Sequence, residues 1–351
     1  MRALVVGGGI GGLAAALALH RRGCQVQVWE RAAEFAEVGA GLSLWPNAMR
    51  ALDTLGLADR VRALGAVERG GGVRDRSGRW LTRTDNAEIE RRHGWPLIVV
   101  HRADLLRVLV DALPAAVLRP NTELTDLAQA HGFDLIVGAD GLHSTVRQLC
   151  WPDAPLTRYS GSTSWRAVTA PLAQPPTEGA ATWGAGQRFG FTAMTGNRCY
   201  VFATARTAAG GRRDELRERF GDWPDPIPRL LDAVTEVVRR DLYDLPPLRT
   251  YVDGRVALLG DAAHAMTPSL GQGACQALED AVTLAAVGLA GYDRLRLRRT
   301  QAIVRRSARL SAVSQWTWPP AVLARDVAAR LTPVSATLRA MDPVLGWKPR
   351  A

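Results

Sequence analysis

Lysine is almost absent from this sequence. Lys348 is the only lysine among 351 residues, so arginine carries nearly all of the positive charge, and the formal net charge is +10. A surplus of this size can indicate a nucleic-acid partner. The arginines, however, are scattered along the chain, and no basic cluster alternates with aromatic residues. We therefore expect no nucleic-acid partner.

Cysteines and long hydrophobic runs are also scarce. The four cysteines lie far apart without C-x-x-C spacing, which argues against a zinc site, any other metal centre or a disulfide framework. No run approaches the ~18 apolar residues of a membrane span. The apolar N-terminus lacks the small-residue cleavage site of a signal peptide. The expectation is a cytoplasmic protein with free thiols at Cys24, Cys150, Cys199 and Cys275.

A glycine-rich turn is the strongest feature that is present. In residues 3–31, a β-forming run meets this turn, an Ala/Leu-rich segment follows, and a second alternating run ends on Glu30. Gly7, Gly9 and Gly12 occupy the G-x-G-x-x-G positions, which allow a tight turn, close approach to a pyrophosphate and packing of the helix on the sheet. Glu30 has the spacing of an acid that binds a ribose hydroxyl. The pattern predicts dinucleotide binding and favours FAD or NAD over NADP.

The rest of the chain indicates an α/β protein with an inserted β-sheet. Pro46-Asn47 is expected to open a helix, Ser77-Gly78 to turn a hairpin, and residues 99–113 to be helical. Residues 158–206 read as several strands and 212–240 as helical. The predicted FAD-binding domain is discontinuous and Rossmann-like, with C-terminal helices (1–67, 97–153 and 250–351), and the predicted substrate domain comprises 68–96 and 154–249.

Two more strand-to-helix motifs follow the first. "DLIVGADGLHSTVR" (134–147) is a buried strand that ends in Asp140-Gly141. In "RVALLGDAAHAMTPSLGQGACQALEDA", Asp261 ends a second buried strand, and a helix is expected from about Gly273. A carboxylate at the C-terminal edge of a sheet can bind ribitol hydroxyls, and helix amides can face a flavin ring. The Arg-rich helix after residue 290 is expected to carry a solvated charged face.

Together the three motifs resemble the single-component FAD-dependent aromatic-ring hydroxylases, the class A flavoprotein monooxygenases with the p-hydroxybenzoate hydroxylase fold. Urate- and salicylate-hydroxylase-like and zeaxanthin-epoxidase-like members look most similar. The resemblance implies non-covalent FAD, reduction by NAD(P)H, addition of O2 at flavin C4a, and oxygen transfer from this hydroperoxyflavin to an electron-rich aromatic ring or alkene. It implies cofactor contacts at Gly7, Gly9, Gly11, Gly12, Glu30, Arg31, Gly41, Ser43, Arg102, Leu124, Asp140, Asp261, Gly271, Gly273 and Ala274.

The resemblance also suggests a substrate site, with Arg188 and Tyr200 facing a small-molecule substrate, although an Arg and a Tyr on strands are usually structural. Gly141 and Arg147 match the family's "DG" motif, which is linked to FAD and the pyridine nucleotide. A base that deprotonates a phenolic substrate is expected, with Tyr200 and His264 as candidates. The chain departs from the family in the short connection at 119–133, where a three-stranded meander is usual, and at Leu106, where many relatives have a polar residue near the flavin.

Several alternatives remain open at this stage. Epoxidation, an isoprenoid epoxidase or flavin-linked reductase, and a non-catalytic flavin-binding relative fit the same motifs. A flavin-dependent halogenase is disfavoured, because the Trp-x-Trp of residues 315–320 lies on the wrong side of Gly260-Asp261 and no internal lysine is available. A monomer and a homodimer are equally compatible with the sequence.

Overall fold

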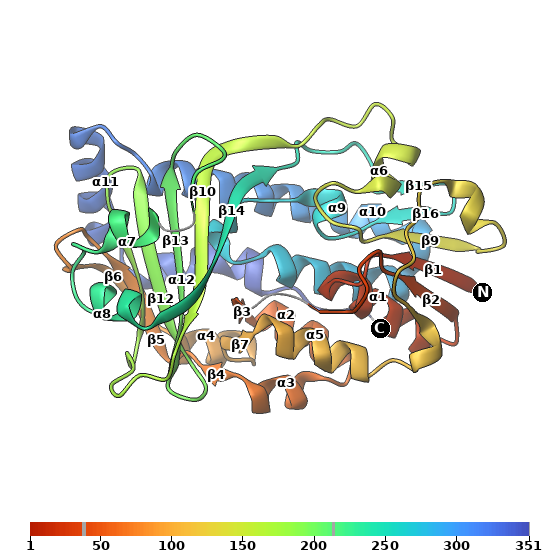
Figure 1. Cartoon of the computed structure of the whole chain (residues 1–351), viewed down its shortest axis with the longest axis horizontal. Helices are drawn as coiled ribbons and strands as arrows, with labels where there is room; N and C mark the ends of the chain where they lie inside the picture. Colours follow the sequence, from red (N-terminus) through yellow and green to blue (C-terminus); the bar gives the residue numbers. More distant parts are fainter. Residues whose placement is uncertain (37–39, 213–214, 351) are drawn as a thin grey trace.

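The computed structural model describes residues 1–36, 40–212 and 215–350, and within these ranges the chain forms three β-sheets. Two of them lie at opposite ends of the molecule (Figure 1). The six-stranded sheet has the order β15 (Val252–Asp253), β16 (Val256–Leu258), β9 (Leu135–Gly138), β1 (Arg2–Val6), β2 (Gln25–Trp29) and β8 (Leu118–Arg119).

The centre of this sheet is parallel. β1 pairs with β2 on one side and β9 on the other, and β16 extends the parallel ladder beyond β9. Helices cover such sheets on both faces, and β1, β9 and β16 are accordingly short and largely apolar. Parallel strands end at the same edge, so the glycine turn after β1, Asp140 after β9 and Asp261 after β16 are brought together there. The α/β fold with a Rossmann-like FAD-binding unit is confirmed.

The seven-stranded sheet is mostly antiparallel, with one parallel pair, β5–β11. Trp165, Phe189 and Phe220 belong to the core on one of its faces, which also contains residues of α7 (Glu215–Phe220) and α8 (Ile227–Asp232). The predicted hairpin at Ser77-Gly78 is present as β5 and β6. The strand order is β14 (Val234–Asp244), β10 (Arg158–Thr169), β13 (Arg198–Arg206), β12 (Gln187–Met194), β11 (Gly179–Trp183), β5 (Gly70–Arg74) and β6 (Trp80–Asp85).

A small sheet and the helices complete the fold. The small sheet has the order β3 (Gly41–Leu44), β7 (Ile98–His101) and β4 (Ala66–Val67). The helices are α1 (Ile10–Arg21), α2 (Pro46–Thr54), α3 (Ala58–Leu64), α4 (Asn86–His93), α5 (Arg102–Asp111), α6 (Thr145–Cys150), α7 (Glu215–Phe220), α8 (Ile227–Asp232), α9 (Asp261–His264), α10 (Gly273–Ser314), α11 (Pro319–Leu331) and α12 (Val334–Leu345), with 3-10 turns η1 (Ala115–Val117), η2 (Leu127–Ala130) and η3 (Pro268–Leu270).

Helix α10 is broken at Gly288, which has φ 63° and ψ −174°. Arg296 Nε lies 2.6 Å from Asp280 Oδ1, although these residues are 16 positions apart on the same helix. A straight helix of that length spans ~24 Å. The chain therefore turns back at Gly288, and its second part packs along its first.

Three sequence expectations need correction. The stretch 212–240 is only partly helical: α7 and α8 are followed by strand β14, and residues 213–214 lie outside the described ranges. Residues 99–101 belong to strand β7, so the predicted helix at 99–113 begins only at Arg102. The charges after residue 290 do not all face solvent, because Arg296 is completely buried.

The remaining departures from the family pattern are visible in the fold. Between β8 and β9 the described chain forms only the turn η2, so the connection at 119–133 is short, as the sequence indicates. Leu106 packs in the main hydrophobic core. No helix in the described ranges is long and apolar enough to cross a bilayer.

Candidate active site

The turn after β1 leaves no room for side chains where it meets the sheet. Gly7 has φ +108°, and a Cβ on it would lie 2.4 Å from the Ala139 carbonyl oxygen. A Cβ on Gly12 would lie 2.0 Å from the Gly7 carbonyl oxygen. Gly9, by contrast, has no atom within 4 Å of an added Cβ, and no side chain caps α1. The first amides of α1 therefore remain available to an anion such as a pyrophosphate.

Glu30 follows β2 and lies against this turn. Its Oε2 accepts a hydrogen bond from the Gly8 amide at 2.7 Å, and its Oε1 accepts one from the Ala32 amide at 2.8 Å. Glu30 and the exposed Arg31 both line the large cavity described below. The carboxylate is thus next to the glycine turn, as the spacing predicts.

Asp140 and Arg147 of the "DG" motif point to different places. Asp140 lines the cavity, and its carboxylate accepts hydrogen bonds from the Ser144 hydroxyl at 2.6 Å and the Val146 amide at 3.0 Å. Arg147 is buried, does not line the cavity, and donates to the carbonyl oxygens of Ala262 and Leu142. Arg147 therefore holds the sheet edge together and is not placed to meet a ligand in this cavity.

The end of β16 and the start of α10 form the other wall. Gly260 has φ 58°, a backbone conformation that favours glycine, and the exposed side chain of Asp261 follows it. At the start of α10, no side chain caps the helix, and an added Cβ on Gly273 would meet nothing within 4 Å. Two helix N-termini and a carboxylate thus surround the same space.

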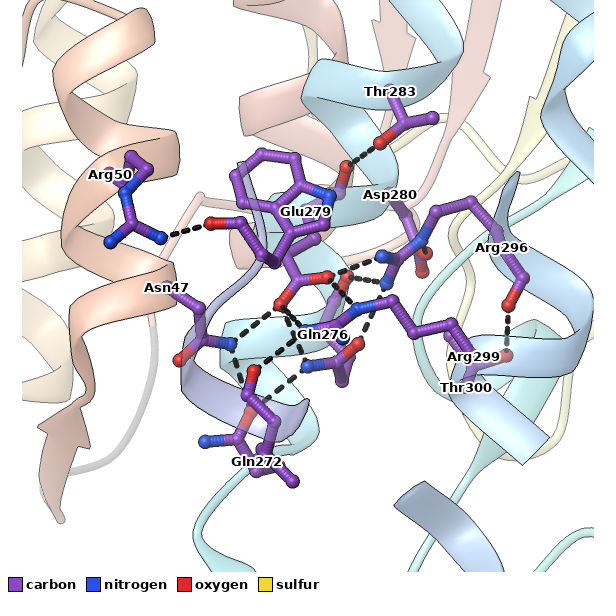
Figure 2. Close-up of polar contacts among 12 residues, drawn as sticks. Asn47, Arg50, Gln272, Gln276, Glu279, Asp280, Thr283, Arg296, Arg299 and Thr300 are labelled. Atoms are coloured by element: carbon purple, nitrogen blue, oxygen red, sulfur yellow. Dashed lines mark hydrogen bonds and ion pairs between the residues drawn. The ribbon is translucent and has the colours of Figure 1, made fainter. Parts of the chain in front are cut away.

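A buried cluster of charged and amide side chains connects the loops behind this wall (Figure 2). Asp280 accepts a hydrogen bond from the Gly260 amide at 2.9 Å and one from Arg296 Nε at 2.6 Å. Arg296 also forms an ion pair with Glu279, which accepts a hydrogen bond from Asn47 Nδ2 at 2.6 Å. The starts of α2, α9 and α10 are therefore fixed to one another.

Two further contacts complete the cluster. Gln272, the residue before α10, accepts hydrogen bonds from Asn47 at 3.0 Å and Gln276 at 2.9 Å. Arg299 pairs with Glu279 at 2.8 Å and donates to the Val344 carbonyl oxygen at 2.6 Å, which attaches α12 to the cluster.

His264 belongs to this cluster and not to the cavity. Its Nε2 lies 2.6 Å from Asp280 Oδ2, and it is buried outside the cavity lining. Burial works to raise the pKa of Asp280, but Arg296 and then His264 outweigh it, so the pKa lies below its ordinary value. This position gives no support to His264 as the base.

The loops surround a single large cavity of about 1030 Å³ that continues to the seven-stranded sheet. Of the cofactor residues predicted from the sequence, Gly12 alone does not line it, since Gly12 packs against Gly7. The lining includes Gly7, Gly9, Gly11, Glu30, Arg31, Gly41, Ser43, Arg102, Leu124, Asp140, Asp261, Gly271, Gly273 and Ala274.

Arg188 and Tyr200 line the part of the cavity that is formed by the sheet. Arg188 is 6% exposed, its Nε donates to Thr204 Oγ1 at 2.7 Å, and in the described part of the chain no carboxylate pairs with it. Burial and then Arg166 lower the pKa of Arg188 to about 10. Burial raises the pKa of Tyr200, with Arg166 and Arg102 opposing the rise. This end of the cavity is therefore positively charged at neutral pH.

Sequence reasoning missed several residues that line this end. Arg166 could have been found, because an arginine between Trp165 and Ala167, in a strand expected to be half-buried, needs a polar neighbour or a ligand. Glu68 and Thr192 carry no such signal, since strand pairing brings distant segments around them. Trp183 and Phe202 add aromatic surface.

Comparison with known proteins agrees with this geometry. The family model described as "FAD binding domain" matches residues 1–292. The aurachin C monooxygenase/isomerase of Stigmatella aurantiaca is 38% identical over an aligned length of 348 residues. The alignment covers 89% of this chain and 89% of the relative. The FAD-dependent urate hydroxylase of Klebsiella pneumoniae is 35% identical over an aligned length of 312 residues. That alignment covers 82% of this chain and 81% of the relative.

Solved structures agree as well. Klebsiella pneumoniae HpxO in complex with FAD and uric acid superposes with a TM-score of 0.89 at 29% identity, covering 98% of this chain and 97% of that one. A salicylate hydroxylase substrate complex, at 22% identity and a TM-score of 0.80, shares the fold. The chain therefore belongs to the FAD-dependent aromatic-ring hydroxylase family, the class A flavoprotein monooxygenases, as its three motifs indicate.

Proposed function

We propose that this monooxygenase uses NAD(P)H and O2 to hydroxylate an electron-rich aromatic small molecule that carries an acidic group. The observation that carries the proposal is the continuity of one cavity from the glycine turn of α1 to the arginine-bearing face of the seven-stranded sheet. A flavin bound along the first part would bring its ring toward the second. We further propose that residues 1–67, 97–153 and 250–351 hold the cofactor and that 68–96 and 154–249 hold the substrate.

The residues at the first part of the cavity fit FAD. The uncapped amides of α1 suit the pyrophosphate, and Glu30 suits a ribose hydroxyl. Asp261 suits the ribitol chain, and the N-terminus of α10 at Gly273 places partial positive charge where electron density rises on a reduced ring. FAD, when bound, supplies the redox chemistry that activates O2 with electrons from NAD(P)H.

The sheet supplies substrate recognition. The unpaired guanidinium of Arg188, with Arg166 beside it, favours a carboxylate, phenolate or similar anion. Trp183 and Phe202 offer flat apolar surface for a ring. Enclosure of the ring in this cavity would exclude water from the reacting atoms. Urate, the substrate named for one relative, combines an aromatic ring with acidic character, in agreement with this chemistry.

The cofactor assignment is tested with Asp261→Ala, and Asp253→Ala on the exposed edge strand β15 serves as the matched control. We expect wild type and the control to purify with non-covalent FAD, and Asp261→Ala to lose it or bind it at least tenfold more weakly. Full flavin retention by Asp261→Ala would contradict the assignment. The reaction is tested by screening aromatic acids and phenols for stimulated oxidation of NADH and NADPH. Incorporation of one atom from labelled O2 then distinguishes hydroxylation from mere flavin reduction.

A further inference from the structure

Glu68 has no role in the function proposed above, yet it lines the same cavity. It lies between β4 and β5, and its backbone is fixed on both sides. The Glu68 amide donates to the Leu97 carbonyl oxygen at 3.0 Å, and the Glu68 carbonyl oxygen accepts from Asn86 Nδ2 at 3.0 Å. Because the backbone is held in this way, the direction in which the side chain leaves it is set.

The carboxyl group lies on a surface made by two glycines. Gly71 of β5 and Gly179 of β11 are partners in the parallel register. A Cβ on Gly179 would lie 1.8 Å from Glu68 Oε1, and one on Gly71 would lie 3.3 Å from the same atom. Any larger residue at position 179 would occupy the space of the carboxyl group. The two glycines therefore leave space for the Glu68 carboxyl group against the face of the sheet.

The carboxyl group has no cationic partner in that place among the described residues. Within residues 1–36, 40–212 and 215–350, no cation lies within ion-pair distance of Glu68. The neighbouring Thr192 hydroxyl is buried and lines the cavity, and its hydrogen bonding to the carboxyl group works to lower the pKa of Glu68. A buried carboxyl group with one hydroxyl neighbour and no cation keeps acceptor positions that a donor on a ligand can satisfy.

We propose that Glu68, with the Thr192 hydroxyl beside it, forms a second substrate subsite that accepts a hydrogen bond from an N–H or O–H group on the aromatic ring system. The proposal rests on the proposed function, because it concerns the same substrate. Thr192 is four residues from Arg188 on β12, which is ~13 Å along a strand, so an aromatic ring fits between the two polar ends. The substrate class is an aromatic compound with an anionic group at one end and a donor at the other.

The surroundings of Glu68 make its charge adjustable near neutral pH. Burial raises the pKa of Glu68 to about 7, and the Thr192 hydroxyl opposes part of the rise. Cys199 on β13 does not titrate in this range, because burial raises the pKa of its thiol to about 12. Glu178 is paired with Arg83 at the edge of the sheet. Glu68 should therefore become a stronger, charged acceptor as the pH rises through 7.

The experiment uses FAD-loaded oxidised enzyme and isothermal calorimetry with two matched pairs of probes. Meta-hydroxybenzoate and meta-methoxybenzoate share the carboxylate and differ in the O–H donor. Indole-5-carboxylate and its N-methyl derivative differ in the N–H donor. We expect wild type to bind the donor of each pair about 10- to 100-fold more tightly, the range for a hydrogen bond to a charged group. In Glu68→Met the two probes of each pair should bind with about equal affinity. The isosteric Glu68→Gln should give a preference between those of wild type and Glu68→Met.

Two controls separate recognition from folding. Glu178→Gln neutralises the carboxylate of the residue that precedes Gly179 and should leave the preference unchanged, and FAD content is measured for every variant. The preference should grow between pH 6 and 8 in wild type and stay flat in Glu68→Gln, since phenol and carboxylate probes titrate near ~10 and ~4. An equal preference in wild type and Glu68→Met, or no binding of any probe, would overturn the proposal. Failure of the proposed function would appear elsewhere, as an absence of FAD or of NAD(P)H oxidation in wild type.

Discussion

Replacing Arg296 by Met should destabilise the fold by about 3–5 kcal/mol, the cost of removing one partner from a buried ion pair. Arg296, Glu279 and Asp280 are all completely buried. Methionine fills much of the volume but leaves two carboxylates with fewer partners. Glu279 keeps Arg299 at 2.8 Å, whereas among the described residues Asp280 keeps only the Gly260 amide and His264. The loss therefore falls mainly on Asp280.

The loss of stability in Arg296→Met should depend on pH, and the pKa of Asp280 determines in which direction. In wild type the folded-state pKa of Asp280 is below its unfolded value, so its contribution to stability is constant above about pH 4 and disappears only at lower pH. Without Arg296, burial dominates and raises that pKa above its unfolded value. Protonation then relieves part of the cost at lower pH, and the deficit of Arg296→Met should be larger at pH 8 than at pH 5.

Thermal unfolding at saturating FAD measures the effect, with a decrease in Tm on the order of 4–7 °C expected for a chain of this length. Arg298→Met is the matched control, because Arg298 is exposed on the same helix and should change Tm by about 1 °C or less. Adding Asp280→Asn to Arg296→Met should restore part of the stability. A deficit below about 1 kcal/mol, or one that does not change between pH 5 and 8, would refute the assignment of a strongly coupled pair.

Three further changes test the cavity. Gly12→Ala places a Cβ 2.0 Å from the Gly7 carbonyl oxygen and should weaken FAD binding at least tenfold, as flavin fluorescence titration would show. Gly41→Ala places a Cβ 2.2 Å from Tyr200 Cγ and should displace that ring, so that aromatic ligands bind more weakly in calorimetry while FAD content is retained. Arg188→Met should weaken binding of aromatic carboxylates about 10- to 100-fold and of neutral phenols much less; equal losses for both ligand classes would argue against an anion site.

The parallel sheet and its three motifs could be predicted from the sequence because each motif is local. A strand, a turn and a helix within some thirty residues determine where Gly7, Asp140 and Asp261 lie. The sequence does not predict strand β14, because it is an edge strand in which apolar and polar residues do not alternate cleanly. The pairing of Gly71 with Gly179, which places Glu68 at the cavity, joins segments that only the complete sheet brings together.

The burial of Arg296 depends on one residue, Gly288, whose effect no local pattern reveals. An uninterrupted helix would carry Arg296 ~24 Å beyond Asp280 and leave its charge in solvent, as the amphipathic pattern suggests. With φ 63° and ψ −174°, Gly288 adopts a conformation that is essentially restricted to glycine, and an added Cβ there would meet no other atom. The constraint is therefore backbone conformation and not space. By turning α10 back on itself, Gly288 brings Arg296 to the two carboxylates that bind Gly260 and Asn47, so this remote glycine fixes the geometry of loops that line the cavity.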